Sequence, residues 1–443
     1  MSQYRAYPAY KDSGIEWIGQ VPEVWKTGKL KHLGTLKGGS GFSIDMQGRT
    51  DNELPFYKVG DLSKSQDNIS LIRSSNSISR SEAKDLGATV FPVNTIVWAK
   101  IGAALLLNRR RISRTACCLD NNMTGFIVNS KKVSIKYAFY LMNAIDFSFF
   151  ARPGAVPSLS EGEQSSIPIV IPSYEESLTI AATLDHKTAR IDALIEKKTR
   201  FIALLKEKRQ ALITHAVTKG LYPNAKMKDS GIEWIGQVPE EWLNRKVFHA
   251  FQAIGSGTTP PSKEHEWYQG GTIPWITTSE LRENTVVKTK KCVTSDAMQK
   301  FSALKIFPAG SLAIAMYGAT IGRLGVLGIP ATTNQACCVL SGERDLNIEF
   351  LYYWLMAFRA DIVAFFSEGG GQPNINQEVI ASLRVPSPAP DEQASIAATL
   401  DHETTRIDVL ISKVEQSITL LKERRAAFIT AAVTGQIDLR GKQ

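Results

Sequence analysis

The sequence predicts an α+β fold in which two tandem α/β domains are separated by two long helices. Three observations support this prediction. Two blocks of the 443-residue chain each occur twice, and each copy of the second block lies near the start of a stretch with helical periodicity. The segments between the blocks contain short β-like runs. The period of about 217 residues is far too long for a solenoid unit. It therefore indicates two domain-sized halves.

The first repeated block reads KDSGIEWIGQVPE at residues 11–23 and again at 228–240, and each copy is followed by a tryptophan, Trp25 or Trp242. The second block reads IAATLDH at residues 180–186 and again at 396–402. Chance does not produce identities of this length, so the two halves share one frame.

Residues 175–217 have the periodicity of an amphipathic helix, and the second copy of the repeat has the same pattern. Gly220 with Pro223 ends the first helix, and Gly435 ends the second. Each helix has one narrow apolar stripe, so the simplest prediction is that the helices bury their stripes against each other as a coiled coil. The alternative is that each helix packs only on its own globular domain. The residues expected at the interface are Leu184, Ile191, Ile195, Ile202, Leu205, Leu212, Leu400, Ile407, Ile411, Val414, Ile418, Leu421 and Phe428.

The two segments between the repeats share only sparse landmarks. Short β-rich runs occur at residues 95–98, 312–315 and 324–327, and helical stretches occur near 134–150 and 346–366. We expect two compact domains of about 145 residues that share a scaffold and differ in surface, as in a tandem reader. The predicted boundaries are 1–25 for the N-terminal repeat, 26–170 for the first domain, 171–242 for the central helix and linker, 243–385 for the second domain, and 386–443 for the C-terminal helix and tail.

The formal charge of the chain is +9, and the excess lies in the two predicted domains. Segment 26–170 has 19 basic and 11 acidic residues, a net +8, and segment 243–385 has 13 and 11, a net +2. A basic balance favours a polyanion partner. The sharpest cluster is Arg109, Arg110 and Arg111 with Arg114 close behind, which suits phosphates or guanine; the alternative is a solvated loop.

In the second domain, residues 255–261 resemble a flexible polar loop, and residues 277–279 and 332–335 offer hydroxyls and amides to base edges or phosphates. Turn chemistry explains these residues equally well. Residues 369–376 fit a hinge or a phosphate-binding loop. The candidate DNA-binding residues are Lys58, Lys100, Arg109, Arg110, Arg111, Arg114, Thr258, Thr259, Lys263, Thr277, Thr278, Ser279, Tyr317, Arg323, Asn334 and Gln335.

Motifs of catalysis are missing from the sequence. We find neither the Gly-rich cofactor loop and Asn/Asp-Pro-Pro-aromatic tetrapeptide of a methyltransferase nor a GxxxxGK[ST] phosphate loop. The six histidines and five cysteines have no metal-site spacing, and the odd cysteine number fits reduced thiols. No apolar run is long enough to span a bilayer, and the start of the chain lacks a signal-peptide pattern. We therefore expect a cytoplasmic protein that is not an enzyme and binds no metal or cofactor itself.

The chain resembles the specificity subunits of type I restriction-modification systems over nearly its whole length. The residues that carry the resemblance are GIEWIGQVP at 14–22 and 231–239, IPWIT at 273–277, TNQAC at 333–337, PNIN at 373–376, DEQASIA at 391–397 and VTGQID at 433–438. The first half departs from this pattern, with AVPSL at 155–159 where the second half has QPNIN, so contact residues are not transferred between halves.

The resemblance implies that each domain is a target-recognition domain that reads one half of a bipartite, asymmetric double-stranded DNA sequence. It implies that the helices form an antiparallel coiled coil with internal pseudo-twofold symmetry, which docks two modification (methyltransferase) subunits. These subunits bring S-adenosylmethionine and methylate adenine, and restriction subunits add ATP- and Mg-dependent cleavage. Two alternatives stay open: a bivalent DNA-binding regulator that acts without a methyltransferase, and an enzyme with an unrecognised site.

Overall fold

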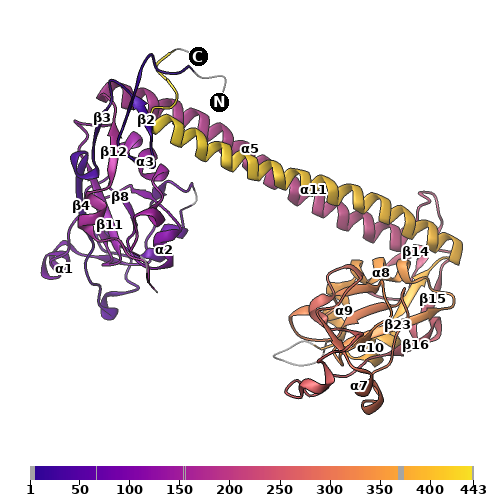
Figure 1. Cartoon of the computed structure of the whole chain (residues 1–443). Coiled ribbons are helices and arrows are strands. Elements are labelled where there is room, and N and C mark those ends of the chain that lie inside the picture. The colour runs from indigo at the N-terminus through magenta and orange to yellow at the C-terminus, as the bar shows by residue number, and fades with distance from the viewer. Residues whose placement is uncertain (1–4, 66, 153, 155, 368–373, 442–443) are drawn as a thin grey trace. The chain divides into compact units, whose positions relative to one another are not determined.

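The computed structural model describes residues 5–65, 67–152, 154, 156–367 and 374–441 (Figure 1). The chain forms two compact units, one of residues 1–198 with 416–443 and one of residues 199–415. The two long helices, α5 (Tyr174–Lys219) and α11 (Pro390–Val433), each contribute to both units. Each unit therefore combines one mixed domain with part of both helices.

The first unit is built on a five-stranded sheet in the order β4-β11-β8-β9-β6 and a three-stranded sheet in the order β10-β5-β7. The strand pairs β1-β2 and β12-β3 complete it. The strands are β1 (Tyr10–Asp12), β2 (Gln20–Pro22), β3 (Lys26–Lys29), β4 (Gly34–Gly38), β5 (Leu54–Tyr57), β6 (Ser70–Leu71), β7 (Ser77–Ile78), β8 (Ile96–Ala99), β9 (Arg111–Ser113), β10 (Cys118–Leu119), β11 (Met123–Val128) and β12 (Pro168–Ile171). The helices are α1 (Arg80–Asp85), α2 (Ala103–Leu106), α3 (Ile135–Ala144) and α4 (Glu161–Ser165).

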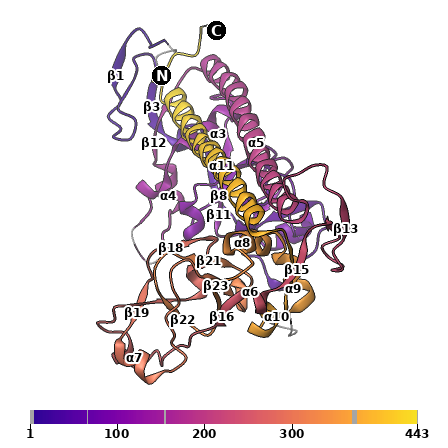
Figure 2. The same ribbon diagram turned by 90° about the vertical axis from the view of Figure 1, so that its right-hand side faces the viewer.

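The second unit repeats this topology strand for strand, with β16-β23-β20-β21-β18 and β19-β17-β22 as its sheets and β13-β14 and β15-β24 as its strand pairs. The strands are β13 (Met227–Asp229), β14 (Gln237–Pro239), β15 (Leu243–Lys246), β16 (Phe251–Gly255), β17 (Ile273–Ile276), β18 (Asn284–Val286), β19 (Lys291–Val293), β20 (Leu312–Ala315), β21 (Leu324–Leu327), β22 (Thr332–Thr333), β23 (Cys337–Glu343) and β24 (Arg384–Ser387). The helices are α6 (Val247–Ala250), α7 (Ser295–Lys300), α8 (Ile348–Ala357), α9 (Arg359–Phe366) and α10 (Gln377–Ser382), several of which are labelled in Figure 2.

The predicted β-runs and helices correspond closely to these elements. Residues 312–315 and 324–327 are β20 and β21, and residues 96–99 form β8. The stretch 346–366 is two helices rather than one, because the backbone leaves the helical region at Phe358 (φ −106°, ψ 15°). No described helix is long and apolar enough to cross a bilayer.

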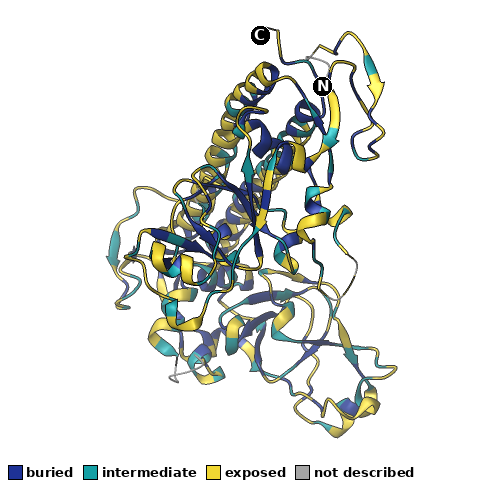
Figure 3. Ribbon diagram, turned by 90° about the vertical axis from the view of Figure 1, so that its left-hand side faces the viewer, coloured by how far each residue is buried: buried dark blue, intermediate teal, exposed yellow. Residues whose placement is uncertain are grey.

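The stripe residues of α5 and α11 are all buried or half-buried, and the residues between them are largely exposed (Figure 3). In the second unit, Leu205 packs with Ile407 and Ile411, and Ile202 and Leu212 lie against this group. Leu184 and Leu400 belong instead to the cores of the first and second domains. The helices thus pair with each other and also pack on their own domains, so the two alternatives hold at different positions.

Two ion pairs define the direction of this pairing. Arg425 lies 2.9 Å from Asp192 in the first unit, and Arg209 lies 3.1 Å from Asp408 in the second. As the residue number rises along α5, the number of its partner on α11 falls, so the predicted antiparallel arrangement is confirmed. The repeat relates the two pairs, since Asp192 and Arg209 correspond to Asp408 and Arg425 at an offset of 216.

Residues of the first repeated block and the tryptophan that follows each copy pack against the ends of the long helices. Gly435 follows α11 with φ +74°, and an added Cβ there would lie 2.3 Å from the Pro22 side chain. Gly220 follows α5 with φ +70°, packed against Trp242. Trp25 donates a 3.0 Å hydrogen bond to Glu176 in the first turn of α5. Glycine is needed at both helix ends because only it adopts this left-handed backbone without strain.

Candidate nucleic-acid interface

The ends of several strands meet at one edge of the second unit. Strands β17 and β22 are parallel and stop side by side, with Ile276 opposite Thr333. Strands β16 and β20 run antiparallel to β23, so they end where β23 begins. We call the residues that follow these strand ends the second strand-end surface: Thr258, Thr259, Thr277, Tyr317, Asn334 and Gln335. The structure thus brings together six candidates that are up to 77 residues apart in the sequence.

The loop before this surface is held tightly by its neighbours, so the expectation of a flexible loop at 255–261 is wrong. An added Cβ on Gly257 would lie 1.8 Å from the Thr333 carbonyl oxygen, and the Gly257 amide donates a 3.0 Å hydrogen bond to the Thr333 hydroxyl. Trp275 donates to the carbonyl of Thr258 at 3.1 Å, and Tyr268 donates to that of Pro260 at 2.6 Å. Only glycine permits so close a backbone approach.

Polar side chains on the second strand-end surface bond to one another. Thr259 donates from its hydroxyl to Oε1 of Gln335 at 2.6 Å, and Tyr317 donates to the Gln335 carbonyl at 2.7 Å. Oδ1 of Asn334 is enclosed and accepts no hydrogen bond from the residues that the structure describes. Water or a ligand is the expected donor to such an atom.

Residues 277–279 use their hydroxyls within a turn, as in the second of the two explanations that the sequence allowed. Thr277 caps the short 3-10 helix Thr278–Glu280: its amide donates to Glu280 at 2.8 Å, and its hydroxyl lies 2.9 Å from that of Ser279. These hydroxyls are engaged in the cap, and contact between this run and DNA stays a prediction.

The first unit has the same edge with different chemistry. Strands β4, β5, β8 and β10 end there, and β11 begins there. An added Cβ on Gly39 would lie 2.2 Å from the Asp120 carbonyl oxygen, as on Gly257 in the second unit. We call the residues after these strand ends the first strand-end surface: Ser40, Lys58, Lys100, Asn121 and Asn122.

Two predicted lysines lie on the first strand-end surface. Lys58 follows β5 and donates to Gln47 Oε1 at 2.9 Å, with its ammonium 5.9 Å from the centre of the Phe42 ring. Lys100 follows β8 and its ammonium passes over Gly38. Both side chains are only half-buried, so both charges are open to a phosphate or a base.

The arginine cluster does not act as one surface. Arg110 is 0% exposed, stacks 4.0 Å from the centre of the Phe147 ring, and donates to the carbonyls of Asn108 at 2.6 Å and Ile145 at 2.7 Å. Arg111 is 6% exposed in β9 and donates to Asn68 at 3.1 Å. The expectation that Arg110 and Arg111 contact DNA is therefore corrected, because their guanidinium groups hold the domain interior together.

The other two arginines of the cluster remain accessible. Arg109 is half-buried and donates to the hydroxyl of Ser63, the last residue of the 3-10 helix Val59–Ser63 that follows β5, on the side of the first strand-end surface. Arg114 is exposed and donates to the Ser70 hydroxyl at 2.9 Å, at the opposite end of the sheet because β9 runs antiparallel to β8.

Burial lowers the pKa of the Arg110 guanidinium to about 9, so this buried arginine remains charged at neutral pH.

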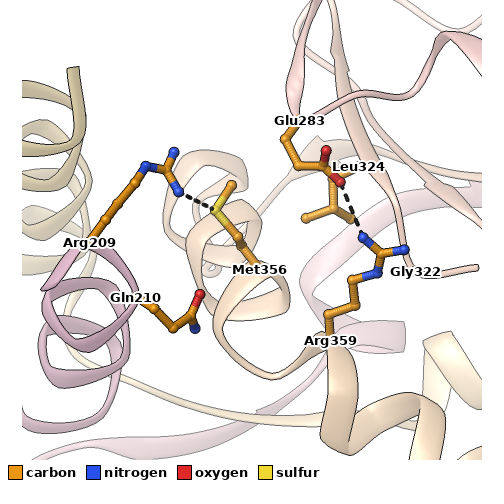
Figure 4. A pocket seen from close by; sticks show the side chains of 7 residues that line it. All are labelled: Arg209, Gln210, Glu283, Gly322, Leu324, Met356 and Arg359. Carbon is orange, nitrogen blue, oxygen red and sulfur yellow. Dashed lines mark hydrogen bonds and ion pairs between the residues drawn. The ribbon is translucent and has the colours of Figure 1, made fainter. Parts of the chain in front are cut away.

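Arg323 belongs to a group of compensated charges in the second unit. Glu283 lies 3.7 Å from Arg323 and 3.6 Å from Arg359, and Arg359 also donates to the Ile321 carbonyl at 2.7 Å. A cavity of about 350 Å³ opens beside this group (Figure 4). Its lining residues are Arg209, Gln210, Glu283, Gly322, Leu324, Met356 and Arg359. Lys263 is exposed in the loop after Pro261, and residues 369–373 lie outside the described residues.

Four of the five cysteines are core residues, and Cys292 is half-buried. Cys117, Cys118, Cys337 and Cys338 are buried free thiols, and burial raises the pKa of Cys117 and of Cys338 to about 12. In the described part of the chain, no group of His, Cys, Asp and Glu side chains could hold a metal ion.

Sequence reasoning missed Gly39, and it assigned Gly257 to a flexible loop rather than to a close backbone contact. The signal was present in the sequence, since GGSG at 38–41 begins at the last residue of β4 and leads toward β5, and GSGT at 255–258 begins at the last residue of the equivalent strand β16 and leads toward β17.

Comparisons with known proteins agree with this architecture. The type I restriction modification DNA specificity domain matches residues 22–202 and 239–420. The MjaIX specificity subunit of Methanocaldococcus jannaschii is 30% identical over 172 residues, which cover 38% of this chain and 39% of that relative. The putative MjaX specificity subunit of the same organism is 22% identical over 441 residues, 96% of each chain. The EcoR124I/EcoR124II specificity subunit of Escherichia coli is 22% identical over 322 residues, 71% of this chain and 70% of its own.

Solved structures share the fold. A chain from a structure of type I R-M system assembly and conformational transition aligns with a TM-score of 0.73 at 13% identity, covering 93% of this chain and 98% of its own. The HsdS subunit of Thermoanaerobacter tengcongensis aligns with a TM-score of 0.56 at 14% identity, covering 94% and 98%. Because the specificity domain matches most of both halves, the chain belongs to the family of type I restriction-modification specificity subunits.

Proposed function

We propose that the chain reads a bipartite, asymmetric double-stranded DNA target, with one half-target read by each unit. The observation that carries this proposal is that one repeated frame presents two chemically different strand-end surfaces: the first combines two lysines with a hydroxyl and amides, and the second has hydroxyls and amides without a lysine. Lysines suit phosphates and guanine, whereas amides and hydroxyls suit base edges. Specificity subunits are recognition subunits and not enzymes in their own right.

We further propose that the paired helices dock two methyltransferase subunits. The repeat supports this, because an identical block and an equivalent ion pair occur in each unit and provide two equivalent positions. S-adenosylmethionine then belongs to the methyltransferase subunits, and ATP and Mg belong to restriction subunits of a complete complex.

An exchange of one domain tests the reading of half-targets. Residues 26–170 are replaced by the corresponding domain of another family member, and methylated adenines are mapped in cells that also express the methyltransferase subunit. One half of the methylated sequence should change and the other should stay. A change in both halves would show that the units are not independent readers. Specific binding without any methylation would favour the bivalent regulator.

We also propose that the helices set the gap between the half-targets, because α5 and α11 are each continuous through both units. Inserting four residues between Arg200 and Leu204 adds about 6 Å, or roughly one to two base pairs, and keeps the apolar stripe nearly in phase. The same half-targets should then be methylated with a longer spacer. An insertion of two residues is the control, because it rotates the stripe by about 200° and exposes it, so it should impair methylation more than the four-residue insertion does.

A further inference from the structure

We propose that Gln335 is a specificity-determining residue of the second unit, and that its side-chain amide donates to the N7 acceptor of a purine in the major groove. This inference rests on the proposed function, and it assigns one base contact within it.

The backbone around Gln335 is fixed from both sides. The Gln335 carbonyl accepts from Tyr317 at 2.7 Å, the preceding Asn334 amide donates to the Ile276 carbonyl at 2.9 Å, and the following carbonyl, of Ala336, accepts from the Met316 amide at 2.8 Å. Three consecutive residues of the β22–β23 turn are therefore anchored to β17 and β20. The exposed side chain starts from a rigid base, as a precise contact requires.

The side chain is oriented as well. Thr259 donates to Oε1 at 2.6 Å, which directs Oε1 toward the 257–260 loop and Nε2 away from it. This loop is in turn fixed by the close approach of Gly257 to Thr333 and by the bond from Trp275. Among the described residues, the hydrogen bond of the Gln335 side chain is made through Oε1, and Nε2 of this exposed side chain donates to none of them. Gln335 thus presents a preoriented pair of N–H donors to the surroundings.

Several polar groups in and beside the second strand-end surface are already engaged, and the enclosed Oδ1 of Asn334 is an acceptor rather than a donor. Thr277 and Ser279 are used in the helix cap, and Arg323 is paired with Glu283. An exposed amide held in one rotamer loses side-chain entropy without burying apolar surface, so the arrangement serves a ligand better than it serves stability.

The donor selects the base. In the major groove, adenine and guanine present an N7 acceptor and thymine an O4 acceptor, whereas cytosine presents an N4 donor. The outward N–H groups therefore disfavour cytosine, and a purine fits better than thymine because it has a second polar group, N6 or O6, beside N7. Oε1 keeps a second lone pair for the N6 donor of adenine, which would make the contact bidentate.

The test uses the full-length chain in complex with the methyltransferase subunit and a pool of random duplex DNA, from which bound sequences are enriched and read. The Gln335→Glu variant replaces donors by acceptors, and Glu accepts from the N4 donor of cytosine. One position of one half-target should change from purine toward cytosine, with roughly 5- to 150-fold weaker binding to the parental sequence. The other half-target should stay the same, which shows that the variant is folded.

The Thr259→Val variant removes only the orienting hydroxyl. It should reduce discrimination at the same position by a smaller factor and leave the preferred base unchanged. The matched control is Gln237→Glu, the same charge change at an exposed position in β14, and it should leave the enriched sequence as in the parent.

The outcomes separate the two proposals. If the parent enriches a bipartite sequence that Gln335→Glu leaves intact, the assignment of Gln335 is overturned while the proposed function stands. If the parent enriches no sequence at all, the proposed function is overturned and the assignment falls with it.

Discussion

The first and second strand-end surfaces stand on the same frame and differ in nearly every outward group. Each has a glycine pressed against the carbonyl of a neighbouring strand, Gly39 in the first unit and Gly257 in the second. Above these glycines lie Lys58 and Lys100 in one unit and a network around Gln335 in the other. The comparison teaches that the duplication preserved backbone geometry and left surface chemistry free to diverge.

The two surfaces also differ in how strongly their polar groups are engaged. In the first unit the lysines are half-buried cations that meet few partners, which suits attraction to the phosphate backbone. In the second unit the hydroxyls and the amide are bonded to one another, which suits a fixed pattern of donors and acceptors. We expect salt dependence to come mainly from the first unit and base discrimination mainly from the second.

The largest effect should come from the arginine that the first unit buries. Arg110→Ala leaves the carbonyls of Asn108 and Ile145 unpaired and removes the stack on Phe147, so it should lower the free energy of unfolding by about 3 kcal/mol. Denaturant unfolding measures the loss. The control is the exposed Arg114→Ala, with a change within about 0.5 kcal/mol. Equal losses of unfolding free energy in both variants would show that the Arg110 guanidinium lies on the surface, where it would add to the positive charge of the first unit.

The two glycines test whether the frames are equivalent. Gly39→Ala and Gly257→Ala each place a methyl group against a backbone carbonyl, at 2.2 Å and 1.8 Å, and each should cost about 1–3 kcal/mol of stability. Each variant should also disturb only its own half-target in methylation mapping. The control is Gly41→Ala, where an added Cβ meets nothing within 4 Å. If Gly257→Ala does not lower the stability, the backbone around Gly257 packs less tightly than the backbone around Gly39.

The lysines test the electrostatic side of the comparison. Lys58→Gln combined with Lys100→Gln should reduce the slope of log binding constant against log salt by about 1.8, because each phosphate contact contributes about 0.9. Binding titrations at several salt concentrations measure the slope. The matched change in the second unit, Thr258→Val with Thr259→Val, should leave the slope as it is. An unchanged slope in the lysine variant would show that these lysines do not meet phosphates.

The smallest effect concerns the equivalent ion pairs between the helices. Asp192→Asn and Asp408→Asn each remove one partly exposed pair, so each should cost about 0.5 kcal/mol, and the two costs should match. Thermal unfolding of the two variants checks this. Each change leaves the charge of the arginine partner, Arg425 or Arg209, in place. A double-mutant cycle that adds the matching Arg→Gln change therefore measures the interaction energy of the pair alone. Clearly unequal coupling energies would show that the two ion pairs are not equivalent, although the helix backbones around them are.

The sequence by itself determined the duplication, the two helices and the apolar stripe of each helix. Identical blocks at a constant offset need no structure to be seen, and an apolar stripe at spacings of three and four is buried, here against the other helix at Leu205 and against a domain core at Leu184 and Leu400. For this reason all the predicted interface residues, from Leu184 to Phe428, are buried or half-buried. Domain boundaries drawn along the chain remain predictions, and cuts into consecutive domains do not describe the first unit, which combines residues 1–198 with residues 416–443.

The tertiary structure alone decided which polar residues share a surface. Arg109, Arg110 and Arg111 are neighbours in sequence, yet Phe147 and the Ile145 carbonyl hold Arg110, and Asn68 holds Arg111, in the interior. Thr259, Tyr317 and Gln335 are distant in sequence, yet the order and direction of the strands place them within hydrogen-bond reach of one another. Local sequence records periodicity, whereas strand order and register depend on contacts between segments far apart in the chain, and these contacts determine which residues share each strand-end surface.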